Sequence, residues 1–384
     1  MNISEIKLSE VWKVFGPAWL VMLADVDAAS IITAMQTGAS TKYDFIAVLL
    51  LLIIPLYFIQ EIAGRVGSVT KKGLGHLIRE NFSREVAIVL SFPMAASDFL
   101  SYVVNYAGIA IGMSILGVPP IITLPLVYII HILIIYNKKY ASAEKILLAV
   151  SIVMVIAYLI FMQRGISNYP VIPSNINQSF LFLLAANVGA VIMPFMLFYQ
   201  TTATAQKEFH SVRATKIETI VGAVASQIIM IAIVIVSASL SSNLTFSNTH
   251  DIANAIMDLG GKHAPIIFSI GLVSAGFLAL VVISMAGAWG ITEALGVKKD
   301  EWFKIYILES LPAVIVPLIL PNLISLTLNL MVALVFVLIG PVIALGLLAQ
   351  NKKLMKEYAL STFDKLAFWS SVLVVIVCGL VAFI

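Results

Sequence analysis

Charged residues are scarce in this sequence. Lysine, arginine, aspartate and glutamate make up 11% of its 384 residues, whereas hydrophobic residues make up 61%. A typical soluble domain carries about 25% charged residues. The composition therefore excludes a soluble globular protein and predicts an integral membrane protein. The small net charge of +3 reflects the loops of such a protein and gives no indication of a nucleic-acid partner.

Cysteine and catalytic motifs are nearly absent as well. The single Cys378 lies in an apolar run, which excludes an intramolecular disulfide and predicts a packing role. The zinc-protease pattern HExxH does not occur. The histidines fall mainly in or near predicted loops, without paired helical spacing: His76, His131, His210, His250 and His263. The sequence therefore predicts no enzyme and no prosthetic group.

Long apolar segments recur along the whole chain. Residues 1–13 are polar and amphipathic, so they predict no removable signal peptide. About eleven later segments are long enough to cross roughly 30 Å of hydrocarbon as helices: near 15–37, 45–63, 88–116, 119–136, 144–163, 180–204, 216–241, 265–294, 303–320, 323–349 and 366–384. One polytopic, all-α transmembrane domain covering residues 1–384 accounts for them.

The basic residues are distributed unevenly among the connections. With the N-terminus inside, 20 of the 23 lysines and arginines fall in connections predicted to be cytoplasmic, as the positive-inside bias requires. Only Lys42, Arg164 and Lys262 fall elsewhere. This pattern predicts a multi-pass protein of the cell membrane, in contact with the lipid bilayer, with a cytoplasmic N-terminus and an external C-terminus.

Three acidic residues lie deep within predicted spans, Asp25 and Asp27 in the first and Asp98 in the third. An ionised side chain at the bilayer centre costs about 2.5–3.5 kcal/mol on insertion scales and usually marks a pathway or site. No lysine or arginine lies in the predicted core of any span. A cation from solution is therefore the favoured partner of Asp27, with a water-filled vestibule as the alternative.

The spacing of the first two acids limits how they can act together. On a regular α-helix, Asp25 and Asp27 point about 200° apart and cannot face one site. Either only one of them is a ligand, or the helix unwinds here. An unwound stretch would free backbone carbonyls, which hard cations bind readily.

A second unusual span covers residues 185–207 and reads AANVGAVIMPFMLFYQTTATAQK. Gly189 and Pro194 flank its middle, and Pro194 cannot donate to the carbonyl of Ala190. We expect a break near residues 190–193. Met193 then lies beside freed carbonyls, where its thioether can bind a soft or borderline metal; the alternative is a methionine that fills the core.

Two interrupted spans, one opening each half of the chain, are typical of transporters built from inverted repeats. The repeats are expected at about 14–163 and 180–349, with an extra helix at about 366–384. Binding sites in such folds lie at the midplane between the broken helices.

The sequence resembles the natural-resistance-associated macrophage proteins (NRAMP). The first span of that family reads G-P-A, then D-P-G-N, then Q-x-G-A, and this chain has GPAWLVMLADVDAASIITAMQTGA at 16–39. The sixth span of the family carries G-A-x-x-M-P-H, which GAVIMPF at 189–195 matches except for its last residue. Similar stretches are QEIAGRVGSVTKKGL at 60–74 and FSIGLVSAGFLALVVISMAGAWGITEAL at 268–295.

The resemblance implies a leucine-transporter-like 5+5 fold and a metal site. Its ligands would be the Asp27 carboxylate, the Met193 thioether and the carbonyls of Ala24 and Ala190. Ser30 stands in place of the family asparagine.

Other positions depart from the family. Phe195 replaces a histidine that the proton route would use, and Gln200 stands where many members carry a second histidine. The stretch MLFYQ at 196–200 is similar to that of NRAMP-related magnesium transporters. Asp98 lies one turn from Ser101 and Val104, onto which the acids of the family's third span fall.

The function implied is import of Mn²⁺ or Fe²⁺ by alternating access, linked to protons and carried out by a monomer. The metal is the transported substrate rather than a cofactor. Asp25, Asp98 and Gln200 are secondary or proton-linked candidates. Alternatives are Mg²⁺ transport and, with less support, Na⁺-coupled uptake of a small solute, for which the paired acids are unfavourable; a receptor or scaffold would leave those acids unexplained.

The first helix break is unusual in its residues. Ala28 and Ala29 occupy the Pro-Gly positions of the motif, and alanine is the best helix former. The break must then depend on repulsion between Asp25 and Asp27, on local bonding by Ser30 and on the bound ion. We expect the unwinding of residues 24–29 to depend partly on the metal.

Overall fold

The computed structural model describes residues 16–136, 172–173, 175–207, 211–240, 249–296 and 301–383, and within these ranges the protein is entirely helical. The helices are α2 (Pro17–Asp25), α3 (Ala28–Thr41), α4 (Ile46–Thr70), α5 (Leu74–Asn81), α6 (Arg84–Ile115), α7 (Pro120–Tyr136), α9 (Gln178–Val191), α10 (Pro194–Ala205), α11 (Val212–Ala238), α12 (Thr249–Gly260), α13 (Ala264–Leu295), α14 (Trp302–Ile319), α15 (Leu323–Gln350), α16 (Lys352–Met355), η3 (Lys356–Tyr358), α17 (Thr362–Leu380) and η4 (Val381–Phe383).

The predicted membrane spans correspond to these helices. Eight helical segments of the described part are long and apolar enough to cross a bilayer, with α9 and α10 counted as one, and the bent pair α2–α3 would make a ninth. The shorter apolar helix α7 occupies the predicted span 119–136. The predicted span 144–163, together with Arg164, His210 and residues 1–13, lies outside the described residues. The all-α membrane fold is confirmed, and the connections add the short helices α5, α12 and α16.

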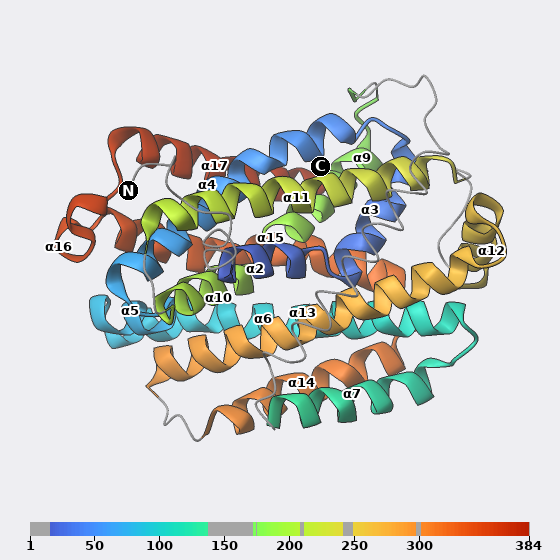
Figure 1. Cartoon of the computed structure of the whole chain (residues 1–384), viewed down its shortest axis with the longest axis horizontal. Coiled ribbons are helices and arrows are strands. Elements are labelled where there is room, and N and C mark those ends of the chain that lie inside the picture. Colours follow the sequence, from blue (N-terminus) through green and yellow to red (C-terminus); the bar gives the residue numbers. More distant parts are fainter. Residues whose placement is uncertain are drawn as a thin grey trace, which may run out of the picture.

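The helices pack into a bundle around two broken spans. Figure 1 shows α13 running alongside α6, with α14 and α7 beyond them, and α4 and α11 on the opposite side. Apolar side chains remain exposed on the outer helices, among them Leu51, Phe92, Ile121 and Leu308, as expected for surfaces that face lipid. The centre holds α2, α3, α9 and α10.

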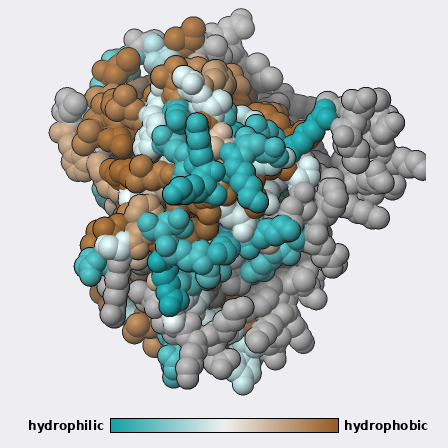
Figure 2. All heavy atoms as spheres, turned by 90° about the vertical axis from the view of Figure 1, so that its left-hand side faces the viewer, coloured by the Kyte–Doolittle hydropathy of each residue, from teal (hydrophilic) through white to brown (hydrophobic). Residues whose placement is uncertain are grey.

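Hydrophilic side chains gather on one end of the bundle, which Figure 2 views directly. This end carries α5 and α16, and its exposed basic residues include Lys72, Lys353 and Lys356. Several connections that the sequence assigns to the cytoplasm therefore meet at one end. The assignment of that end to the cytoplasm, and of the C-terminus to the outside, remains a prediction from the basic residues.

An ion pair between Arg65 and Asp364 joins the last long helix, α17, to the bundle. Arg65 of α4 contacts Glu61 at 2.6 Å and Asp364 of α17 at 2.9 Å. The planar guanidinium has five N–H donors in a fixed fork, which suits it to binding two carboxylates in a defined geometry. This connection holds α17, which the predicted repeats do not include, against α4.

Candidate metal-binding site

The first broken span separates at two residues. Helix α2 ends at Asp25 and α3 begins at Ala28, with a bend of 49° between them. Asp27 is the N-cap of α3, and its Oδ1 accepts a hydrogen bond from the backbone N–H of Ser30 at 2.7 Å. Aspartate is among the best N-cap residues because it satisfies an orphan N–H of the first turn. The chain thus starts a new helix here without a proline or glycine.

The residues assigned to this break lie at its edges. Ala28 and Ala29 are the first two residues of α3, so only Val26 and Asp27 are outside both helices. Because the chain leaves α2 at Asp25, the carbonyl of Ala24 loses the helical donor that residue 28 would supply. The unwound stretch is therefore shorter than residues 24–29.

The second broken span separates at Ile192 and Met193, between α9 and α10. Pro194 is the first residue of α10, where its missing N–H costs nothing. Gly189 lies inside α9 and is not part of the break. A Cβ at this position would collide with the carbonyl of Met331 on α15, so Gly189 allows close packing of α9 against α15.

A hydrogen bond joins the two breaks. The Oγ of Ser30 donates to the carbonyl of Ala190 at 3.0 Å, to which Pro194 cannot donate a helical hydrogen bond because it has no N–H. Asp27, Ser30 and Met193 are each 0% exposed. The structure thus brings Asp27, Ser30, Ala190 and the Met193 segment to the same junction, closed to solvent.

Asn105 of α6 completes the surroundings of Asp27. Its Nδ2 donates to Asp27 Oδ2 at 2.7 Å and to the carbonyl of Ser101 at 2.9 Å. Each Asp27 oxygen therefore accepts one hydrogen bond, and no ion pair among the described residues involves Asp25, Asp27 or Asp98. An ionised carboxylate has about four acceptor positions, so Asp27 retains lone pairs for a cation.

Of the secondary candidates, Asp25 lies beside this junction and Gln200 does not. Asp25 is the last residue of α2; it is buried, and its Oδ1 has no hydrogen-bond partner. Gln200 of α10 points elsewhere, because its Nε2 donates to Thr219 Oγ1 of α11 at 3.0 Å. The structure does not bring Gln200 to Asp27.

The third candidate, Asp98, belongs to a separate polar group. Asp98 lies two turns before Asn105 on α6, fully buried, with no hydrogen bond to either carboxyl oxygen. A Cβ built on Gly287 of α13 would lie 2.6 Å from Asp98 Oδ2 and 3.5 Å from Oε2 of Glu309 on α14. The two carboxyl groups therefore border the same glycine of α13.

A hydrogen-bonded cluster lies on the same part of α6. His131, which falls within the predicted span 119–136, is fully buried within α7. Its ring nitrogens contact Tyr106 Oη at 2.8 Å and Ser284 Oγ at 2.9 Å, and Tyr102 Oη donates to the same serine at 2.9 Å. Buried networks of this kind fix the positions of the helices that contribute to them.

Asn105, Glu309 and His131 were not identified from the sequence. A signal for Asn105 was present, because Asp98, Ser101 and Asn105 recur at helical spacing on one face of an otherwise apolar span. Their partners on α3, α13 and α14 are distant in sequence.

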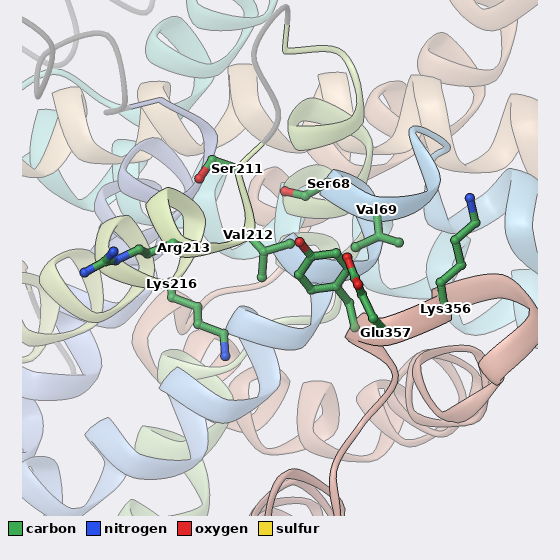
Figure 3. A pocket seen from close by; sticks show the side chains of 9 residues that line it. Ser68, Val69, Ser211, Val212, Arg213, Lys216, Lys356 and Glu357 are labelled. Atoms are coloured by element: carbon green, nitrogen blue, oxygen red, sulfur yellow. The ribbon is translucent and has the colours of Figure 1, made fainter. Parts of the chain in front are cut away.

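An open pocket of about 740 Å³ lies apart from this junction, at the hydrophilic end of the bundle. Figure 3 shows Arg213 and Lys216 on one side of it and Lys356 and Glu357 on the other. Three basic residues against one acid repel a divalent cation. The buried junction is therefore the better candidate for a metal site.

Comparisons with known proteins agree with this architecture. Residues 18–384 match the family model described as natural resistance-associated macrophage protein-like. The divalent metal cation transporter MntH of Levilactobacillus brevis is 23% identical over 404 aligned positions, covering 95% of this chain and 87% of that protein. MntH of Yersinia pestis is 26% identical over 305 positions, covering 74% and 73%.

Solved structures show the same fold. A manganese transporter of Eremococcus coleocola superposes with a TM-score of 0.80 at 15% identity, covering 100% of this chain and 90% of that one. MhsT, in complex with L-phenylalanine, superposes with a TM-score of 0.65 at 15% identity, covering 95% and 97%. With the family model matching nearly the whole chain, this protein belongs to the natural resistance-associated macrophage protein-like family.

Proposed function

We propose that this protein carries divalent metal cations of the Mn²⁺ and Fe²⁺ type across the membrane and binds them at the junction of the two broken helices. The observation that supports this proposal is the Ser30–Ala190 hydrogen bond of 3.0 Å, which links the first break, where the buried Asp27 lies, to the second. The similarity of this chain to the divalent metal cation transporters MntH supports it.

The donor set suits a borderline divalent ion. Asp27 supplies the negative charge, Ser30 and the carbonyls of Ala24 and Ala190 supply neutral oxygens, and Met193 supplies a thioether. Carboxylate and carbonyl oxygens alone suit Mg²⁺, Ca²⁺ or Mn²⁺, whereas a thioether favours softer ions. Asp25 would compensate the second positive charge of the metal.

The burial of the site implies alternating access. Asp27 is fully enclosed, so a cation can enter or leave only when helices separate on one side of the junction or the other. The half-helices α2, α3, α9 and α10 end at the site, so they can move while the outer helices stay folded. The breaks therefore serve as ligand sources and as hinges.

Mg²⁺ is the second candidate, favoured by Ser30 and Gln200 in this chain. Met193→Ala separates the two, because a thioether contributes to Mn²⁺ binding and little to Mg²⁺ binding. We expect about a 10-fold loss of Mn²⁺ affinity and less than about a 2-fold change for Mg²⁺, measured by isothermal titration of the full chain.

The matched control for this variant is Met230→Ala, which removes a buried methionine of α11. It should leave both affinities unchanged. Equal binding of Mn²⁺ and Mg²⁺ by the wild type, together with no effect of Met193→Ala, would exclude the role of the thioether.

For proton linkage, we propose the carboxyl groups of Asp98 and Glu309. Asp98 is buried and Glu309 half-buried, both border Gly287, and Tyr102 and Tyr306 are the neighbouring titratable groups. Carboxyl groups that interact closely titrate as a pair. In Asp98→Asn, we expect Mn²⁺ uptake by proteoliposomes to lose most of its dependence on pH, while Mn²⁺ affinity changes less than about 2-fold.

Glu309→Gln should reproduce this behaviour. A wild-type pH profile in both variants would show that the pair takes no part in proton movement.

A further inference from the structure

Asn105 has an unused oxygen beside the proposed metal site. Its side chain is fully buried, and both N–H groups of its amide are engaged, one by Asp27 Oδ2 and one by the carbonyl of Ser101. Its Oδ1 is also buried and has no hydrogen-bond partner in the described structure. A buried acceptor without a partner is uncommon, because it loses its hydration without compensation.

The orientation of the Asn105 amide follows from its neighbours. Rotating it by 180° would place Oδ1 against a carboxylate oxygen of Asp27 and a backbone carbonyl oxygen, neither of which can donate. The oxygen must therefore point away from both acceptors. Because Nδ2 of the same amide is hydrogen-bonded to Asp27, Oδ1 lies close to this carboxylate. Oδ1 is therefore available to a positively charged group that Asp27 binds.

Packing holds Asn105 at the first break. Gly108, one turn later on α6, contacts Ala28, the first residue of α3. A Cβ at Gly276 of α13 would meet both Ala28 and the backbone carbonyl of Asn105 at 3.0 and 3.3 Å. Because α3, α6 and α13 meet here without room for a larger residue, Asn105 has little freedom to move away from Asp27.

We propose that Asn105 Oδ1 is a ligand of the transported cation and strengthens the preference of the site for metals that bind oxygen. This inference rests on the proposed function, since it concerns the ion that Asp27 binds. Its donor and acceptor roles are compatible, because Nδ2 orients Asp27 while Oδ1 contacts the metal. An amide oxygen is a hard ligand that suits Mn²⁺ and Mg²⁺ better than Cd²⁺.

The test is Asn105→Leu, which keeps the shape of the side chain and removes both polar atoms. By isothermal titration of the full chain, we expect Mn²⁺ affinity to fall at least about 10-fold and Cd²⁺ affinity no more than about 3-fold, since Met193 remains. An equal loss for both ions would indicate that Asn105 only positions Asp27, and would overturn the proposal.

Asn105→Asp provides a second measurement, useful if the leucine variant does not fold. It keeps an oxygen and removes the donor. A ligand role predicts Mn²⁺ binding at least as tight as in the wild type, whereas a donor role predicts a loss, because two carboxylates would then oppose each other.

Asn187→Leu is the matched control. Asn187 of α9 is equally buried, and its Nδ2 also donates twice, to Thr37 Oγ1 at 2.7 Å and to the carbonyl of Leu183 at 2.8 Å. It has no carboxylate partner, so its loss should leave the ratio of Mn²⁺ to Cd²⁺ affinity unchanged. The same shift in ratio as in Asn105→Leu would contradict the proposal.

The inference can fail independently of the proposed function. If Asp27→Asn abolishes binding of both ions while Asn105→Leu leaves their ratio unchanged, only the role of Asn105 is wrong. If Asp27→Asn binds both ions like the wild type, the site itself is wrong.

Discussion

Asp27→Asn is expected to weaken Mn²⁺ binding more than about 100-fold, equivalent to about 2.7 kcal/mol, and to abolish uptake. Asparagine is also a strong N-cap residue, so its Oδ1 can still accept from Ser30 N–H and α3 can still begin at Ala28. The substitution therefore removes the charge with little change in the helix break. Isothermal titration with Mn²⁺ and uptake by proteoliposomes measure the two effects.

The charge matters because nothing else on the described structure neutralises it. The N–H groups of Ser30 and Asn105 that donate to Asp27 are neutral. Desolvating an ionised carboxylate is costly unless a positive charge accompanies it. A divalent cation therefore gains its affinity largely from this one side chain.

Two neighbouring acids provide the comparison. Asp98→Asn removes an equally buried carboxyl group two turns along α6 from Asn105, and should keep Mn²⁺ affinity. Asp25→Asn should give an intermediate loss if Asp25 offsets the second charge of the metal; unchanged uptake with an unchanged pH profile would exclude that role. Wild-type affinity in Asp27→Asn would contradict the assignment of the site.

The spans and the second break could be predicted because their causes are local. A run of about 20 apolar residues must form a helix in hydrocarbon, where no water can satisfy its backbone. Pro194 lacks an N–H wherever it is placed, so a break before it followed from the residue itself. The structure places this break at Ile192 and Met193, within the predicted region.

The extent of the first break was less accessible. Asp25 and Asp27 are two residues apart, and Ala28 and Ala29 follow them. The length of the unwound stretch therefore depended on a balance between N-capping by an acid and the helix propensity of the alanines. In the structure, Asp27 caps α3 through Ser30 N–H, and Ala28 and Ala29 remain helical. Aspartate is a favoured N-cap residue, so Asp27 itself carried the signal for a helix start, and the expected local bonding by Ser30 is its backbone N–H bond to Asp27.

Neighbours across the bundle could not be predicted. Asn105 and Asp27 are 78 positions apart, and Asp98 and Glu309 come from different helices to border Gly287 of a third. Hydrophobic periodicity gives the buried face of a helix but not which helix covers it. Gly189 illustrates the same limit, because its role depends on a carbonyl of α15.

Glu218→Ala is expected to release the beginning of α2 and to lower the free energy of unfolding by about 3 kcal/mol, the lower end of the cost of breaking a buried ion pair. Glu218 is a buried residue of α11. Its Oε1 accepts from the backbone N–H of Gly16 at 2.6 Å and of Trp19 at 3.1 Å. Its Oε2 accepts from Lys207 Nζ at 2.8 Å, just beyond α10.

These contacts connect three segments of the chain: the beginning of α2, the segment that follows α10, and α11. One carboxylate caps the N-terminus of α2, where the helix dipole favours negative charge, and pairs with the segment that follows α10. Because α2 and α10 are the halves of the two broken spans that extend toward the same end of the bundle, their separation would open the site on that side. Glu218 is therefore suited to hold that side closed.

The effect of Glu218→Ala is checked by two measurements in a Cys378→Ser background. The midpoint of thermal unfolding should fall, and a cysteine placed at Ala24 should react faster with a water-soluble maleimide, because it is fully buried while α2 is held. The control is Glu80→Ala, since Glu80 pairs with Lys72 and His76 at the exposed surface, where such pairs contribute about 0–1 kcal/mol. Lower stability without faster labelling would mean that Glu218 stabilises the fold but does not hold the site closed.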